Sequence, residues 1–166
     1  MASWFRRGPA FADDAFAGLS LMLTGDAENK THRCELLPAE SLDYSLESLK
    51  HVDAYLGALH RTPPPEPEVL QVVLRTGAYL GEVIRRQRPG LFHWVLYEEA
   101  ARHSPLLRDV PESIATAGIL WKDAESMAFP LGKVCKYLEN GPEDSVYTFG
   151  YVFVRDGLER AAGGRR

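Results

Sequence analysis

The stretch of residues 68–98 constrains the fold more than any other part of this sequence. Apolar side chains recur there at three- and four-residue spacing, which predicts an amphipathic helix over 67–87. Pro67 suits the first turn of such a helix, because the N–H group that proline lacks would have no partner there. A Pro-Gly pair at 89–90 ends the helix, and the aromatic and β-branched run after it predicts a strand over 91–97. Both faces of this strand are largely apolar, so we expect it inside a sheet.

Two glycines of the predicted helix need a reason. Gly77 and Gly81 are four residues apart, and each costs about 1 kcal/mol relative to alanine inside a helix. We expect them on one face, where they allow another backbone to approach closely. Arg75 and Glu82 interrupt the apolar run, so this helix is not expected to span a membrane.

The polar face of the predicted helix carries Tyr79, Glu82 and Arg86. Glu82 and Arg86 have i,i+4 spacing in the favourable order, which contributes roughly 0.2–0.5 kcal/mol on an exposed face. One interpretation is a solvated helix face. The other places Glu82 partly buried beneath the following strand, where it orients Arg85 or Arg86 toward a partner.

The rest of the sequence adds helices and strands around this centre. Residues 146–154 have strand propensity but helical spacing, and we favour a helix because cap residues precede them. The predicted fold is α+β, one domain with a small, mainly antiparallel sheet and helices packed on one face. We expect the core over residues 32–155, with flexible ends at 1–10 and 157–166. The expected strands lie near 32–37, 91–97 and 114–121, and the expected helices near 11–23, 45–59, 67–87 and 130–140.

Composition narrows the classes of function. The chain has 166 residues, enough for one domain with a sizeable core, and its net charge of −4 argues against a general nucleic-acid binder. Cys34 and Cys135 are far apart, and two free buried thiols are favoured over a disulfide. Their spacing gives no zinc signature, so we expect no metal and no cofactor. Asp13 and Asp14 interrupt the apolar stretch near the N-terminus, which argues against a signal peptide and leaves the cytoplasm as the default compartment.

Three segments and one residue together resemble a group of small bacterial proteins of unknown function. They are LDYSLESLKHVDAYL at 42–56, GAYLGEVIRR at 77–86, Trp94, and FPLGKVCKYLENGPEDSVYTF at 129–149. In that group a capped helix opens the domain, a GAYLGEV helix leads to a strand with a tryptophan, and a P-x-x-K-V-x-K-x-L-E-N-G helix closes it. The resemblance implies the same order of elements here. It carries no catalytic or ligand residue to transfer.

No catalytic motif stands out in the sequence. The chain has 23 carboxylates, but no spacing singles out two of them as an acid–base pair. His93 lies in the predicted central strand beside Trp94 and is interpreted as a packed residue rather than a base. Cys135 lies on the apolar side of a predicted helix and is interpreted as a core residue rather than a nucleophile. An enzyme is therefore the less favoured class.

The favoured hypothesis is a non-catalytic accessory protein, for example of the immunity type, that binds another protein. Its contact patch would contain Tyr79, Glu82, Arg86 and Trp94, because tyrosine, tryptophan and arginine are enriched in interface hot spots. For Trp94 itself, a plain core position is the preferred interpretation. Such a binder should show an exposed apolar patch.

The alternative hypothesis is an enzyme, or a small-anion or small-molecule binding protein. Its site would lie in a cleft between the 67–87 helix and Lys133, with Lys136 and Arg86 adding positive charge. A plain solvated surface is the competing interpretation of these three cations. An enzyme should show a pocket in which titratable groups converge.

Overall fold

A computed structural model describes residues 8–163 of the chain, with side chains described as far as Arg155. The helices are α1 (Asp13–Gly25), α2 (Leu49–Arg61), α3 (Glu66–Gln87), α4 (Tyr97–His103), α5 (Pro130–Asn140) and α6 (Val146–Gly163). The strands are β1 (His93–Leu96), β2 (Gly118–Asp123) and β3 (Ser126–Ala128). Short 3-10 turns are η1 (Cys34–Leu36), η2 (Ala39–Ser41), η3 (Pro105–Leu107), η4 (Ile114–Thr116) and η5 (Pro142–Asp144).

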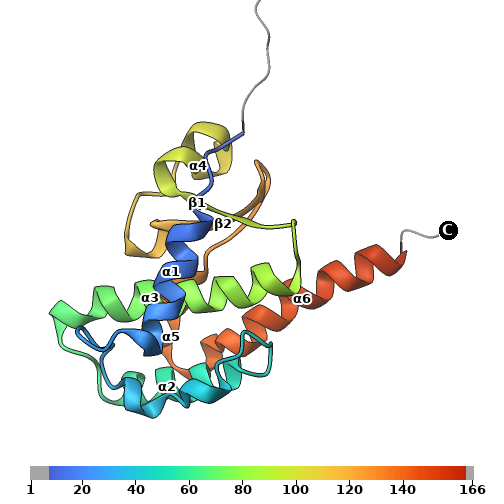
Figure 1. The fold of residues 1–166 in the computed structure, drawn as a ribbon. Coiled ribbons are helices and arrows are strands. Elements are labelled where there is room, and N and C mark those ends of the chain that lie inside the picture. The colour runs from blue at the N-terminus through green and yellow to red at the C-terminus, as the bar shows by residue number, and fades with distance from the viewer. Residues whose placement is uncertain (1–7, 164–166) are drawn as a thin grey trace, which may run out of the picture.

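Helix α3 runs through the middle of the fold, with α1 crossing it and α2 and α5 on another side (Figure 1). It is buried over most of its length, as its broad apolar stripe predicts. A Cβ added to Gly77 would lie 2.9 Å from the Cα of Leu131 in α5, so the expected close backbone approach is confirmed there. A Cβ on Gly81 would lie 2.0 Å from Cζ2 of Trp94, so this glycine makes room for an indole ring instead.

The three strands form an antiparallel sheet in the order β1-β2-β3, which confirms the α+β class. Trp94, Leu120 and Ala128 lie side by side in the register and face the main core, where the longer helices pack. The opposite face carries Val95 and Ile119, which pack in a smaller apolar cluster with residues of α4 and η3. The sheet is therefore covered on both faces, although the long helices share one of them.

The free edge of β1 is closed by the start of α1. The N–H of Ala12 donates to the carbonyl of Trp94 at 2.7 Å, and the N–H of Trp94 donates to Oδ1 of Asp13 at 2.6 Å. The expectation that this strand lies inside a sheet is wrong, since β2 is the only strand paired with it among the described residues. Its buried side chains, Trp94 and Val95, pack in the two apolar clusters on opposite faces of the sheet.

The strand expected at 32–37 is wrong, because the backbone there forms the 3-10 turn η1. Arg33 has a left-handed φ of 50°, which interrupts an extended run. The strand expected at 114–121 begins late, since η4 occupies its first residues and β2 starts at Gly118. Gly118 lies where the ring of Phe16 leaves no space for a Cβ.

The helices expected near 67–87 and 130–140 are confirmed as α3 and α5, and the helix expected near 11–23 as α1. The helix expected near 45–59 begins later, at Leu49, because Ser45 caps a preceding turn by accepting from the N–H of Ser48 at 3.2 Å.

The favoured helix at 146–154 is confirmed and continues as α6 to Gly163, where a flexible end was expected. Asp53 of α2 caps it, since Oδ1 accepts from the N–H of Val146 at 2.7 Å. Of the end expected to be flexible at 1–10, residues 8–10 are described, and the N–H of Ala10 donates to Oε2 of Glu99 at 3.2 Å. Residues 1–7 and 164–166 lie outside the described residues.

Candidate functional site

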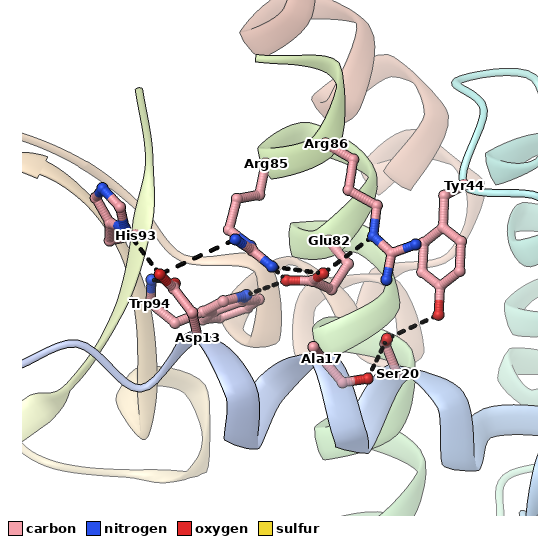
Figure 2. Close-up of polar contacts among 9 residues, drawn as sticks. All are labelled: Asp13, Ala17, Ser20, Tyr44, Glu82, Arg85, Arg86, His93 and Trp94. Atoms are coloured by element: carbon pink, nitrogen blue, oxygen red, sulfur yellow. Dashed lines mark hydrogen bonds and ion pairs between the residues drawn. The ribbon is translucent and has the colours of Figure 1, made fainter. Parts of the chain in front are cut away.

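The most connected polar group of the fold is the buried carboxylate of Glu82, whose side chain is 0% exposed. Oε1 accepts from Nε of Arg85 at 2.7 Å and from Nε1 of Trp94 at 3.0 Å. Oε2 accepts from Nη2 of Arg85 at 3.1 Å and from Nε of Arg86 at 3.1 Å (Figure 2). A buried anion is stable only when it is paired and hydrogen-bonded, and here four donors meet that condition.

The position of Glu82 follows from helical geometry. Residues three and four positions later lie on the same face of a helix, so Arg85 and Arg86 reach back to one carboxylate. The hydrogen bonds to Glu82 raise the pKa of the Arg85 guanidinium. The interpretation of this face as solvated is wrong for Glu82, and its burial beneath the following strand beside both arginines is confirmed.

A second carboxylate, Asp13 at the start of α1, lies beside this network. Its Oδ2 is 2.8 Å from Nδ1 of His93 and 4.0 Å from Nη1 of Arg85. The ring of Phe11 stacks on His93 with 3.9 Å between ring centroids. An aspartate that holds Nδ1 of a histidine is the arrangement of many general bases. A second pair of this kind joins Nδ1 of His32 to Oε2 of Glu68.

Tyr79 of α3 and Tyr44 of the segment before α2 connect these two parts of the fold. The hydroxyl of Tyr79 accepts from the N–H of Tyr44 at 3.1 Å and lies 2.7 Å from Oγ of Ser48. Burial raises the pKa of Tyr79, although the hydrogen bond with Ser48 opposes that shift. The guanidinium of Arg86 lies 3.5 Å from the centroid of the Tyr44 ring, a cation–π contact that fixes the arginine. On its other side, the hydroxyl of Tyr44 lies 2.9 Å from Oγ of Ser20 (Figure 2).

The residues predicted to form a contact patch differ in their exposure to solvent. Tyr79, Glu82 and Trp94 are 2%, 0% and 0% exposed, so they lie inside the fold and form no surface patch. Arg86 keeps an exposed side chain, 42% accessible. Trp94 occupies the core position that the sequence favoured for it, stacked on Phe16 at 4.2 Å between ring centroids.

Lys133 lies on α5, away from the Glu82 network, with its Nζ 2.6 Å from Oδ1 of Asp144. It lines a groove of about 370 Å³, here called the phenylalanine groove, with a floor of Phe129, Phe149 and Phe153. The described lining of this groove contains no residue of α3. None of the hollows with a known lining in the described residues joins Lys133 to the 67–87 helix, and a site between them stays a prediction.

A second concave surface, here called the α1–α3 hollow, has a volume of about 390 Å³. Its apolar lining includes Leu19 and Met22 of α1 and Leu70 and Leu74 of α3. Among the hollows of the described residues for which a lining is known, none includes His93 or Asp13. The Asp13–His93 pair thus has no hollow of known lining beside it, whereas Glu68, which contacts Nδ1 of His32, lines the α1–α3 hollow.

Sequence reasoning missed the roles of Asp13 and Phe11, although a signal existed. Two aspartates before an apolar helical segment are typical of a helix start, where negative charge interacts favourably with the helix dipole. The phenylalanine groove had no such signal, because its lining comes from four segments that are separated in the sequence.

No protein family, curated protein or solved structure matches this chain. The resemblance to small bacterial proteins therefore stays a prediction. Within residues 8–163, no helix has both the length and the apolar composition that crossing a membrane requires. In the same part of the chain, histidine, cysteine and carboxylate side chains form no group of three that could hold a metal ion.

Proposed function

We propose that this chain is a non-catalytic accessory protein that binds another protein through the α1–α3 hollow. The observation that carries the proposal is the exposure of large apolar side chains at the hollow, 54% for Leu70 and 37% for Met22. A contiguous exposed apolar patch on a folded domain is a common mark of a protein interaction site. An immunity-type role, in which the bound protein is blocked, is one form of this proposal.

The surroundings of the hollow support a protein as the occupant. Lys30, Glu68 and Gln71 line it beside the leucines, so an apolar centre is bordered by polar groups of both signs. Protein interfaces have this anatomy, with a dry centre and a polar rim. The Asp13–His93 pair lies beside none of the hollows with a known lining in the described residues, whereas Glu68, which contacts Nδ1 of His32, belongs to the polar border of the α1–α3 hollow.

The test compares two leucines of equal exposure. Leu70 and Leu106 are both 54% exposed, and only Leu70 lines the α1–α3 hollow. Tagged wild-type protein, Leu70→Asp and Leu106→Asp are used to capture partners from lysate of the native host, and captured proteins are identified by mass spectrometry. We expect one stoichiometric protein with the wild type and with Leu106→Asp, and its loss with Leu70→Asp.

Two outcomes contradict the proposal. Equal capture by both aspartate variants would place the contact elsewhere on the surface. A repeated absence of any stoichiometric partner, at low salt as well, would remove the support for a protein-binding role. Circular dichroism of each variant checks that the exposed substitution leaves the fold intact.

A further inference from the structure

The phenylalanine groove differs from the α1–α3 hollow in both its lining and its charge. Its apolar residues come from β3, α5, α6 and the segment around η4, so several elements contribute to one open groove. The groove is lined by Val110, Ala115, Thr116, Met127, Ala128 and Gly132 in addition to its three phenylalanines and two lysines. A volume of about 370 Å³ lies in the range of small-ligand sites.

The aromatic floor is held in place by its own contacts. Phe149 and Phe153 pack with 4.8 Å between ring centroids, and Phe153 meets the edge of the buried Phe92 at 6.1 Å. Arg88 donates from Nη1 to the carbonyl of Phe153 at 3.3 Å, which fixes this turn of α6 against the end of α3. A floor that is fixed before binding loses little freedom when a ligand enters.

The charge at the groove is positive. Lys133 and Lys136 are the titratable residues of its described lining. Asp144 neutralises Lys133 through the 2.6 Å contact, whereas the exposed Lys136 has no ion-pair partner among the described residues. The groove therefore carries one uncompensated cation in a chain whose net charge is −4.

We propose that the phenylalanine groove binds a small apolar carboxylate, a fatty-acid-like molecule whose chain lies on the three phenylalanines and whose head group meets Lys136. The aromatic and aliphatic lining matches an apolar body, and the lysine matches a single negative charge. This site is separate from the α1–α3 hollow and does not depend on the protein-binding proposal.

The experiment uses decanoate as the probe and calorimetric titration as the readout. Wild-type protein is compared with Lys136→Glu, Lys136→Arg and a control, Lys122→Glu. Lys122 is exposed on β2 and does not line the groove, so the control has the same charge change at another place. We expect Lys136→Glu to weaken decanoate binding by about fivefold or more, and the other two variants to change it by less than about twofold.

Methionine methyl resonances locate the bound probe. Met127 lines the phenylalanine groove and Met22 lines the α1–α3 hollow, so the two signals distinguish these hollows. Met127 also lines a further hollow with Leu106 and Leu107, and the Lys136 variants separate binding there from binding in the groove. On addition of decanoate to ¹³C-methyl-methionine protein, we expect the Met127 signal to shift while the Met22 signal stays. The Leu70→Asp variant should bind decanoate as the wild type does, which keeps this test independent of the partner-capture test.

Three results would overturn the proposal. The first is the absence of saturable decanoate binding to the wild type. The second is equal affinity for decyltrimethylammonium, a cation with the same chain, because the lysine would then have no role. The third is a shift of the Met22 signal in place of Met127, which would put the probe in the other hollow.

Discussion

The two halves of α3 each bury one charged side chain, and the two charges have opposite signs. In the first half, Arg75 is 3% exposed, and it donates to the carbonyl of Asn29 at 2.7 Å, to Oγ1 of Thr31 at 3.1 Å and to Oδ2 of Asp26 at 2.8 Å. In the second half, Glu82 is 0% exposed and accepts from two arginines of its own helix and from Trp94.

The difference lies in where the partners come from. Glu82 draws most of its donors from the same helix, so the fold of α3 alone brings its arginines close. Arg75 depends on a separate loop that has no regular structure and must be placed by the rest of the protein. A buried charge of the first kind stabilises a helix face and a strand, whereas one of the second kind ties a loop to the core.

Removing the Glu82 carboxylate should have the largest effect. In Glu82→Ala, both arginines lose their acceptor and the buried Nε1 of Trp94 is left without a partner. We expect the free energy of unfolding to fall by about 3–5 kcal/mol, the usual loss when one member of a buried ion pair is deleted. Urea unfolding followed by circular dichroism measures the change.

Glu99→Ala is the matched control for this variant. Glu99 also pairs with an arginine three residues later, but Arg102 is 66% exposed. We expect a loss below about 1 kcal/mol, because exposed pairs contribute little. Similar losses for Glu82→Ala and Glu99→Ala would mean that burial adds nothing to the Glu82 network.

Arg75→Met should rank second. The substitution removes three hydrogen bonds of a charged donor, but the Asp26 side chain is 17% exposed and can turn to water. We therefore expect a loss of about 2–3 kcal/mol in the free energy of unfolding. Hydrogen exchange should rise first in the 26–31 loop, and unchanged exchange there would contradict the role of Arg75 as its anchor.

Trp94→Phe tests the part of the Glu82 network that crosses to β1. The variant removes the Nε1–H donor and leaves both arginine contacts in place. We expect a loss of about 1–2 kcal/mol, smaller than for Glu82→Ala, because the carboxylate keeps most of its donors. If the two variants were equally unstable in urea, the tryptophan rather than the arginines would dominate the site.

Lowering the pH should produce the smallest change in stability. It should act through Asp26, the partner of Arg75 in the first half of α3. The Asn29 N–H, with a further contribution from Arg75, holds the pKa of Asp26 below its ordinary value. A depressed pKa in the folded state stabilises the fold above the unfolded pKa and loses that contribution as pH falls through the folded value. Between about pH 6 and about pH 3, the urea midpoint of Asp26→Asn should therefore fall less than that of the wild type. Parallel curves for the two proteins would contradict this assignment.

The contrast between Glu82 and Arg75 also explains which contacts of the structure can be predicted from the sequence. The pairing of Glu82 with the arginines follows from i,i+3 and i,i+4 spacing, and the bounds of α5 follow from Pro130 and the Asn140-Gly141 stop. Spacing within the helix cannot predict that Arg75 donates a hydrogen bond to Asn29, which lies 46 residues earlier in the chain. The burial of Tyr79 likewise cannot be predicted from its own helix, because its partners Tyr44 and Ser48 come from a different segment.

The closure of β1 by the first turn of α1 has a consequence for self-association. An open strand edge offers its N–H and C=O groups to any extended chain, and repeated pairing of that kind is how fibres grow. At Trp94 those groups are already taken by the Ala12 N–H and the Asp13 carboxylate. Because α1 continues as a helix, it offers no strand with which another chain could pair. The first turn of α1 therefore ends the hydrogen-bonded sheet at the β1 edge. Loss of Ala12 and Asp13 would leave the backbone N–H and C=O of Trp94 without these partners.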